Sequence, residues 1–147
     1  MSWLTLRTAE PELAASGQQR LHDQVAYLAT MRQDGSPRLH PVRPIVSERH
    51  LLLFMEPASP KGHDLRRDGR YVLHGIVTGA QPWELHEFYV EGQASWVEDP
   101  DLRQAANTAT AFPRDEHFAL FELEVRRAFS TTYGSDGQPL RRRWQAG

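Results

Sequence analysis

Apolar positions recur along the chain in two rhythms, one typical of a helix and the other of β-strands. Between residues 10 and 23, Leu13, Ala14, Gly17 and Leu21 recur at spacings of three to four residues. This spacing predicts a short amphipathic helix, whose middle Gly17 weakens. Runs that are mostly apolar or that alternate predict strands at residues 25–31, 38–46, 50–55, 70–77, 83–97 and 118–132.

Turn-forming residues mark where these strands end and bend. Asp34-Gly35 lies between the first two strands and is a strong signal for a hairpin. Pro41 and Pro44 cannot donate hydrogen bonds to a ladder, so the second strand is expected at an edge or a bulge. The long strand at 83–97 is expected to bend near Gly92.

Two further helices are predicted from their first residues. Ser59-Pro60-Lys61 begins a helix that ends near Asp68, because serine can cap free N–H groups and proline fits the first helical position. Asp99-Pro100 begins another helix, through about Ala111. The order of elements favours a mainly antiparallel β-barrel with peripheral helices.

Composition narrows the functional classes. The 147 residues are expected to form a single domain, 1–147. The absence of cysteine excludes thiolate catalysis, disulfides and thiolate-bound zinc. A net charge of −2 gives no global attraction to nucleic acid or anionic lipid. No long apolar run or basic leader is present, so we expect a cytoplasmic protein without membrane contact.

Familiar catalytic motifs are missing from the sequence. The seven histidines show no pair at metal-binding helical spacing, so we expect no metal site. The serines lack the glycine elbow of hydrolases, and no glycine-rich phosphate or dinucleotide fingerprint occurs.

Lys61 is the only lysine, and it falls in the first turn of a predicted helix. The free N–H groups of a helix start favour the binding of a phosphate.

The order of several short motifs resembles the pyridoxamine 5′-phosphate oxidase-like, FMN-binding split-barrel family. The resemblance covers about residues 24–97. The motifs that carry it are Ala29-Thr30, residues 34–42, Leu53-Phe54, Ser59-Pro60-Lys61, residues 65–70 and residues 88–94. It implies a homodimer of six-stranded antiparallel split barrels, with FMN in grooves at the subunit interface and a small-molecule substrate.

The resemblance also implies positions for the cofactor. Residues lining the flavin phosphate and ring edge would be Arg38, Leu39, His40, Pro41 and Val42. Phe54 and Met55 would offer backbone groups beside the ring, while Ser59 and Lys61 would take the phosphate. Glu87 stands where the oxidase has a glutamine that reaches the flavin.

Two tryptophans leave alternatives open. Trp83 comes directly after Gly79-Ala80-Gln81-Pro82, where a loop meets the long predicted strand, and its indole would stack on a ring or seal a dimer contact. Trp144 follows Arg141-Arg142-Arg143 in a tail that is either solvated or folded back over the groove of one subunit.

We therefore expect an FMN-dependent oxidoreductase of unassigned substrate. The cofactor carries the hydride chemistry in such enzymes, which accounts for the lack of a visible catalytic dyad. Oxidation of pyridoxamine phosphate itself is not expected, since no counterpart of the oxidase's C-terminal substrate-binding segment is found. The alternatives are a deazaflavin-dependent reductase of the same fold, or a barrel that binds flavin or haem without turnover, with His40 or His117 as haem ligand.

Overall fold

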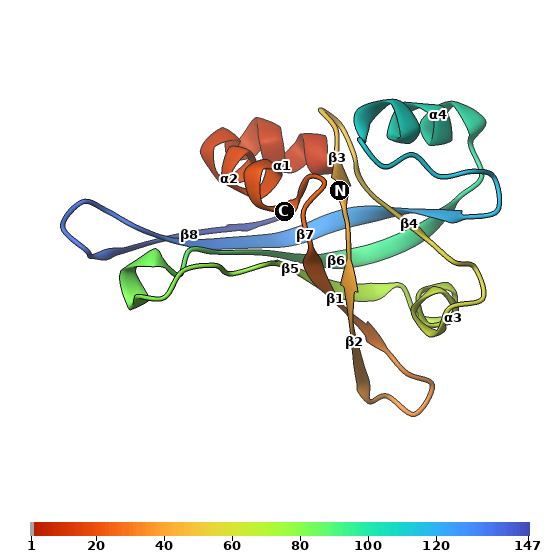
Figure 1. The fold of residues 1–147 in the computed structure, drawn as a ribbon, viewed down its shortest axis with the longest axis horizontal. Helices are drawn as coiled ribbons and strands as arrows, with labels where there is room; N and C mark the ends of the chain where they lie inside the picture. The colour runs from red at the N-terminus through yellow and green to blue at the C-terminus, as the bar shows by residue number, and fades with distance from the viewer. Residues whose placement is uncertain (1) are drawn as a thin grey trace.

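A computed structural model describes residues 2–147. One antiparallel sheet carries most of the chain, and four α-helices lie around it (Figure 1). The helices are α1 (Trp3–Ala9), α2 (Pro11–Leu21), α3 (Pro60–Arg67) and α4 (Pro100–Ala109), with a 3₁₀ turn, η1 (Pro82–Glu84). The strands are β1 (Ala26–Met31), β2 (Pro37–Val42), β3 (Ile45–Val46), β4 (Leu51–Met55), β5 (Arg70–Gly75), β6 (Glu87–Val97), β7 (Ala119–Tyr133) and β8 (Pro139–Gln145).

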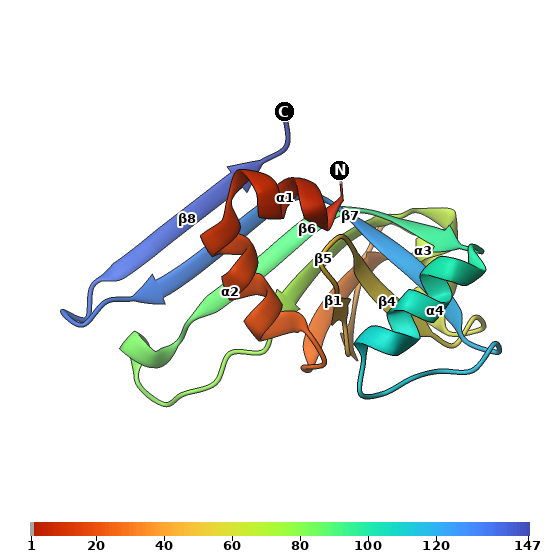
Figure 2. The same ribbon diagram turned by 90° about the horizontal axis from the view of Figure 1, so that it is seen from above.

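The strands follow the order β2-β1-β5-β6-β7-β4-β3, and β8 pairs with the far half of β7. The β1–β2 hairpin lies at one end of this path and β4 with β3 at the other, and α3 connects β4 to β5 (Figures 1 and 2). The long strands β6 and β7 form the middle of the sheet. A register shift between Glu91 and Gly92 bends them, and a Cβ at Gly92 would lie 1.9 Å from the Glu124 carbonyl oxygen.

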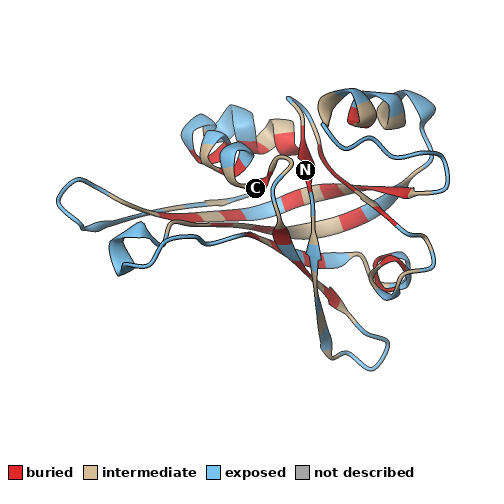
Figure 3. Ribbon diagram, in the orientation of Figure 1, coloured by how far each residue is buried: buried red, intermediate tan, exposed pale blue. Residues whose placement is uncertain are grey.

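The main hydrophobic core lies between α1, α2 and the inner face of the sheet, where buried positions alternate along the strands (Figure 3). Trp3 packs edge-on against Phe88 with ring centroids 6.3 Å apart, and both side chains are fully buried. Gly17 of α2 also faces the Phe88 ring, so glycine is needed for close helix–sheet packing. A second, smaller cluster packs α4 against β3, β4 and β7 through Ala106 and Leu120.

The fold class predicted from the sequence is confirmed as mainly antiparallel β with peripheral helices. The sheet has eight strands rather than six, and it is not closed. The additional strands come from residues 38–46, which break at Arg43-Pro44 into β2 and β3, and from the tail, which forms β8. The helix expected at residues 10–23 is present as α2, and it is preceded by α1, a helix that the sequence pattern did not predict. No helix among the described residues is long and apolar enough to cross a bilayer.

Candidate functional site

A groove of about 470 Å³ opens between the ends of β2 and β4, where the sheet is split. We call it the β2–β4 groove. The size lies within the range typical of small-molecule and cofactor sites. Its lining comes from four parts of the chain and comprises Val25, Pro41, Val42, Arg43, Ile45, Phe54, Met55, Glu56, Ser59, Lys61, Thr110, Phe112, Arg114 and Phe118.

The first turn of α3 forms the polar end of this groove. The Ser59 hydroxyl accepts a hydrogen bond from the Gly62 backbone N–H at 3.2 Å and donates one to the Glu56 carbonyl at 2.7 Å. A Cβ at Gly62 would lie 3.1 Å from that carbonyl oxygen, so glycine allows the preceding loop to close tightly. Within residues 2–147, Lys61 has no carboxylate within 4.0 Å. Its ammonium is therefore available to an anion at the start of the helix.

A buried carboxylate fixes α3 to the first two strands. Asp64 accepts hydrogen bonds from the Thr30 hydroxyl at 2.8 Å, the Arg38 Nε at 2.7 Å and an Arg67 Nη at 3.1 Å. These bonds hold the pKa of the Asp64 carboxyl below its ordinary value, although burial alone would raise it. The Arg38 guanidinium is thereby directed toward α3 and stays beside Asp64.

His40 lies on the same face of β2 as Arg38 and Val42, since these three pair with the inward-facing residues of β1. Burial, together with the positive charges of Lys61 and Arg38, lowers the pKa of the His40 imidazole below its ordinary value. The imidazole is therefore neutral at neutral pH, and an anion bound nearby would favour its protonated form.

The residues expected at the cofactor separate into two groups in the structure. Six of them line the β2–β4 groove together, namely Pro41, Val42, Phe54, Met55, Ser59 and Lys61. Arg38 is held against α3 by its hydrogen bond to Asp64, and His40 lies near the positive charge of Lys61 on that helix. Leu39 points to the opposite face of β2 and is 66% exposed.

The remaining three expected residues lie away from the groove within one subunit. Trp83, on η1, is 55% exposed. Glu87 begins β6, with its carboxylate 3.9 Å from His74. Trp144 sits on β8 opposite Ala128 and is partly buried against the main core, so the tail folds back as a strand. Figure 1 shows η1 and the β7–β8 turn at the end of the sheet opposite α3.

The sequence pattern did not predict one side of the groove. Residues 110–118, between α4 and β7, contribute Phe112, Arg114 and Phe118, and the β2–β3 connection contributes Arg43. The Arg43 guanidinium lies 4.1 Å from the Phe112 ring centre. Only the mixture of aromatic and basic residues in an otherwise polar loop could have indicated this wall.

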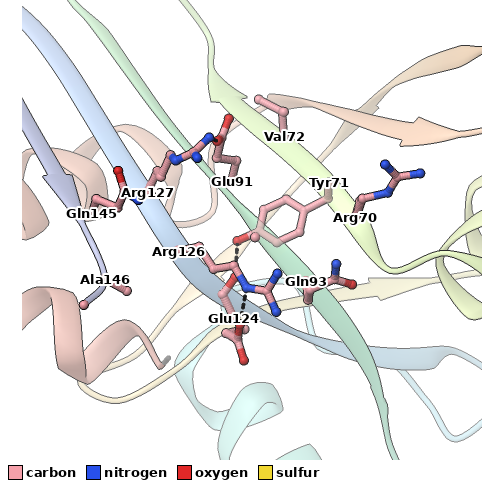
Figure 4. A pocket seen from close by; sticks show the side chains of 12 residues that line it. Arg70, Tyr71, Val72, Glu91, Gln93, Glu124, Arg126, Arg127, Gln145 and Ala146 are labelled. Atoms are coloured by element: carbon pink, nitrogen blue, oxygen red, sulfur yellow. Dashed lines mark hydrogen bonds and ion pairs between the residues drawn. The ribbon is translucent and has the colours of Figure 1, made fainter.

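A second cavity, of about 500 Å³, opens beside the bend of β6 and β7 (Figure 4). Its three arginines are each paired with a carboxylate: Arg70 with Asp68 at 2.6 Å, Arg126 with Glu124 at 2.8 Å and Arg127 with Glu91 at 2.7 Å. Since those charges are already balanced, this cavity is a poorer site for an anion than the β2–β4 groove.

The histidines show no metal-binding arrangement in the part of the chain that is described. Across residues 2–147, no three His, Asp or Glu side chains group closely enough to hold a metal ion. His117, at the edge of the groove, lies with its Nε2 atom 2.6 Å from a Glu56 carboxylate oxygen. That contact occupies the nitrogen that a ligand would otherwise approach.

Comparison with known structures supports a common fold. A conserved hypothetical protein of Mycobacterium tuberculosis is 23% identical over 82% of each chain, with a TM-score of 0.69. A haem binding protein of Mycobacterium smegmatis is 20% identical, covering 89% of this chain and 57% of its own, with a TM-score of 0.69. A protein described as an F420 reductase is 16% identical, covering 76% of this chain and 94% of its own, with a TM-score of 0.58.

Comparison with curated proteins finds no match. The family model described as pyridoxamine 5′-phosphate oxidase, whose members are typically dimeric, matches residues 17–132. That match spans β1 to most of β7 and includes the whole of the β2–β4 groove. By this match, the chain belongs to the pyridoxamine 5′-phosphate oxidase family.

Proposed function

We propose that the protein binds FMN in the β2–β4 groove and acts as a flavin-dependent oxidoreductase. The observation that carries the proposal is the position of Lys61. It is the chain's only lysine, it has no carboxylate partner among the described residues, and it lies in the capped first turn of α3 at one end of a largely apolar groove.

The polar end of the groove suits a phosphate. Free backbone N–H groups at a helix N-terminus carry partial positive charge, and Lys61 adds a full one. His40 faces α3 from β2 with a neutral imidazole that can hydrogen-bond a phosphate, while the charge of Arg38 is balanced by Asp64. Asp64 fixes the angle between α3 and β2 through its bonds to Thr30 and Arg38, so this end is rigid before any ligand arrives.

The apolar part of the groove suits a planar ring system. Val42, Phe54 and Met55 would pack against it and exclude water from one side. Backbone groups of Phe54 and Met55 at the end of β4 would orient the ring edge. A bound flavin supplies two-electron redox chemistry, and the protein contributes binding, orientation and exclusion of water.

The alternative cofactors use the same groove and differ in colour. A deazaflavin would place its phosphate at Lys61 in the same way. Haem would require an axial ligand, for which neutral His40 is available, whereas His117 already contacts Glu56. Absorption spectroscopy of the purified protein, before and after adding FMN, distinguishes a flavin band, a blue-shifted deazaflavin band and a Soret band. Retention of a yellow, phosphate-bearing flavin through dialysis supports the proposal, and a Soret band with no flavin uptake contradicts it.

We also propose that the protein is a homodimer formed through the outer face of the sheet. A row of cross-strand neighbours there runs Tyr27, His74, Tyr89, Phe129 and Arg143. The ring centroids of Tyr89 and Phe129 are 5.1 Å apart, and Arg143 lies 5.5 Å from the Phe129 ring centre.

The outer face also carries exposed apolar side chains. Leu39 and Val72 are exposed there at 66% and 37%, and Tyr27 at 41%, with no helix of the subunit over them. Exposed aromatic and aliphatic side chains of this kind, interspersed with charged ones such as the Glu91–Arg127 pair, are typical of a contact surface. A second subunit would pack its own outer face against this one. The resulting dimer would contain two β2–β4 grooves.

A further inference from the structure

Loop 110–118 forms one side of the β2–β4 groove. This side is separate in sequence from the first turn of α3, where we propose that the cofactor phosphate binds. Phe112 is 43% exposed, and both it and Phe118 line the groove. Arg43 lies over the Phe112 ring at 4.1 Å, and Arg114 lies over the Phe118 ring at 5.3 Å. Aromatic faces and guanidinium groups are therefore interleaved on one side of the groove.

This wall is held in place by α4. The Asn107 side chain donates to the Arg114 carbonyl and accepts from the Arg114 N–H, both at 2.9 Å. Arg103 donates to the Phe118 carbonyl at 2.6 Å. These bonds fix the backbone at Arg114 and Phe118, so this part of the wall is in place before a ligand binds.

Asp23 connects the same wall to the rest of the groove. Its φ of 53° lies in the left-handed region, and among the described non-glycine residues it is the only one with positive φ. Its carboxylate accepts from the Thr110 hydroxyl at 2.5 Å and from the Ala111 N–H at 2.9 Å. Its carbonyl accepts from Arg43 at 3.3 Å. One strained residue therefore positions both Arg43 and loop 110–118.

The charges in the groove exceed what one phosphate requires. In the described residues, Arg43, Lys61 and Arg114 have no carboxylate within 4.0 Å. The one acidic residue of the lining, Glu56, is in contact with His117. If Lys61 serves the cofactor phosphate, two guanidinium groups remain beside aromatic rings, where they match a planar anion.

We propose that Arg43 and Arg114, together with the Phe112 ring, form the subsite for a planar aromatic substrate that carries a carboxylate. The inference rests on the proposed function, because the substrate would lie against the flavin in the same groove. The carboxylate binds the guanidinium groups, the substrate ring packs on the side of Phe112 that Arg43 leaves exposed, and Asp23 acts as a positioning residue for Arg43 and loop 110–118.

Isothermal titration of the FMN-loaded protein with 2-naphthoate, and with its neutral analogue 2-naphthamide, tests the subsite. The parent should bind the carboxylate about tenfold or more tightly than the amide. Arg43→Gln and Arg114→Gln should each remove most of that preference and should weaken FMN binding far less than Lys61→Ala does. Arg49→Gln, at an exposed arginine outside the groove, should leave both affinities as in the parent.

Asp23→Asn and Asp23→Gly test the positioning role. Both residue types tolerate the left-handed backbone, but neither supplies two carboxylate acceptors. Each variant should weaken naphthoate binding more than naphthamide binding, with FMN affinity retained. A purely structural role for Asp23 would lower stability and leave the preference for the carboxylate unchanged.

Two results would overturn the proposal. One is equal affinity of the parent for 2-naphthoate and 2-naphthamide. The other is a loss of FMN affinity in Arg43→Gln or Arg114→Gln as large as that in Lys61→Ala, which would assign these guanidinium groups to the cofactor. The titrations are repeated on FMN-free protein, so that failure of FMN binding alone is recognised as failure of the proposed function and not of the anion subsite.

Discussion

We expect the hydrogen bonds of the buried Asp64 carboxylate to matter more for the shape of the site than any other contact. Its side chain is 3% exposed, and it joins β1, β2 and α3 through Thr30, Arg38 and Arg67. Replacing it by asparagine keeps the size of the side chain and one acceptor oxygen. The substitution removes the charge and puts an NH₂ group where an acceptor is needed.

The cost follows from these contacts. Hydrogen bonds to a charged partner contribute about 1.5–3 kcal/mol each, and an amide oxygen can replace only part of the three. The side chains of Arg38 and Arg67 are 24% and 38% exposed, so water compensates part of the loss on their side. We therefore expect Asp64→Asn to lower the free energy of unfolding by about 2–3 kcal/mol at neutral pH.

The effect should depend on pH in a defined direction. The folded-state pKa of Asp64 is depressed below the ordinary value of 3.8, so its ionised form stabilises the fold above that pH. This stabilisation is lost as the pH falls through the depressed folded-state pKa. The difference in unfolding free energy between parent and Asp64→Asn should accordingly shrink in acid below pH 3.8.

Urea unfolding at several pH values measures this difference, with Asp68→Asn as the matched control. Asp68 also pairs with an arginine near the end of α3, but its ion pair with Arg70 is solvated. Its removal should shift the urea midpoint much less than Asp64→Asn does. A midpoint for Asp64→Asn equal to that of the parent, with an unchanged slope, would refute the role assigned to this contact.

Three further outcomes are expected. Gly17→Ala should lower the free energy of unfolding by about 1–3 kcal/mol, because its Cβ would lie 2.3 Å from the Phe88 ring; an unchanged melting temperature would contradict the close packing. Tyr89→Glu and Phe129→Glu should each convert the dimer into a monomer of 16.8 kDa, as measured by light scattering. A parent protein that is monomeric with flavin bound would disprove the outer-face interface. The FMN-loaded protein should accept electrons from a reduced nicotinamide but not oxidise pyridoxamine 5′-phosphate, since the tail is used as strand β8; robust turnover of pyridoxamine phosphate would overturn that view.

Local signals predicted most of the fold. The Asp34-Gly35 turn, the Ser59 cap and the bend at Gly92 all occur as the sequence predicts, because each depends on backbone geometry within a few residues. Helix α1 and the break between β2 and β3 were not predicted. α1 has only seven residues, too few for a repeating apolar pattern, and the pattern of apolar residues continues across the break at Arg43-Pro44.

The candidate site was predictable only in part, for a related reason. Lys61 and Ser59 could be identified because capping and phosphate binding are local properties of a helix start. The contacts of Asp64 with Thr30 and Arg38 join residues 34 and 26 positions apart, and loop 110–118 meets Asp23 across almost ninety residues. Such contacts depend on how the sheet bends, which no spacing in the sequence records.

Comparison of FMN with riboflavin in the parent and in Lys61→Ala tests the central claim most directly. The claim is that Lys61, at the start of α3, holds the cofactor phosphate. A charge-assisted hydrogen bond of about 1.5–3 kcal/mol corresponds to a roughly ten- to hundredfold loss of FMN affinity in Lys61→Ala. Riboflavin lacks the phosphate and should bind both proteins almost equally, while Lys61→Arg should recover part of the FMN affinity. Unchanged FMN affinity in a Lys61→Ala protein of parental thermal stability would contradict the placement of the phosphate.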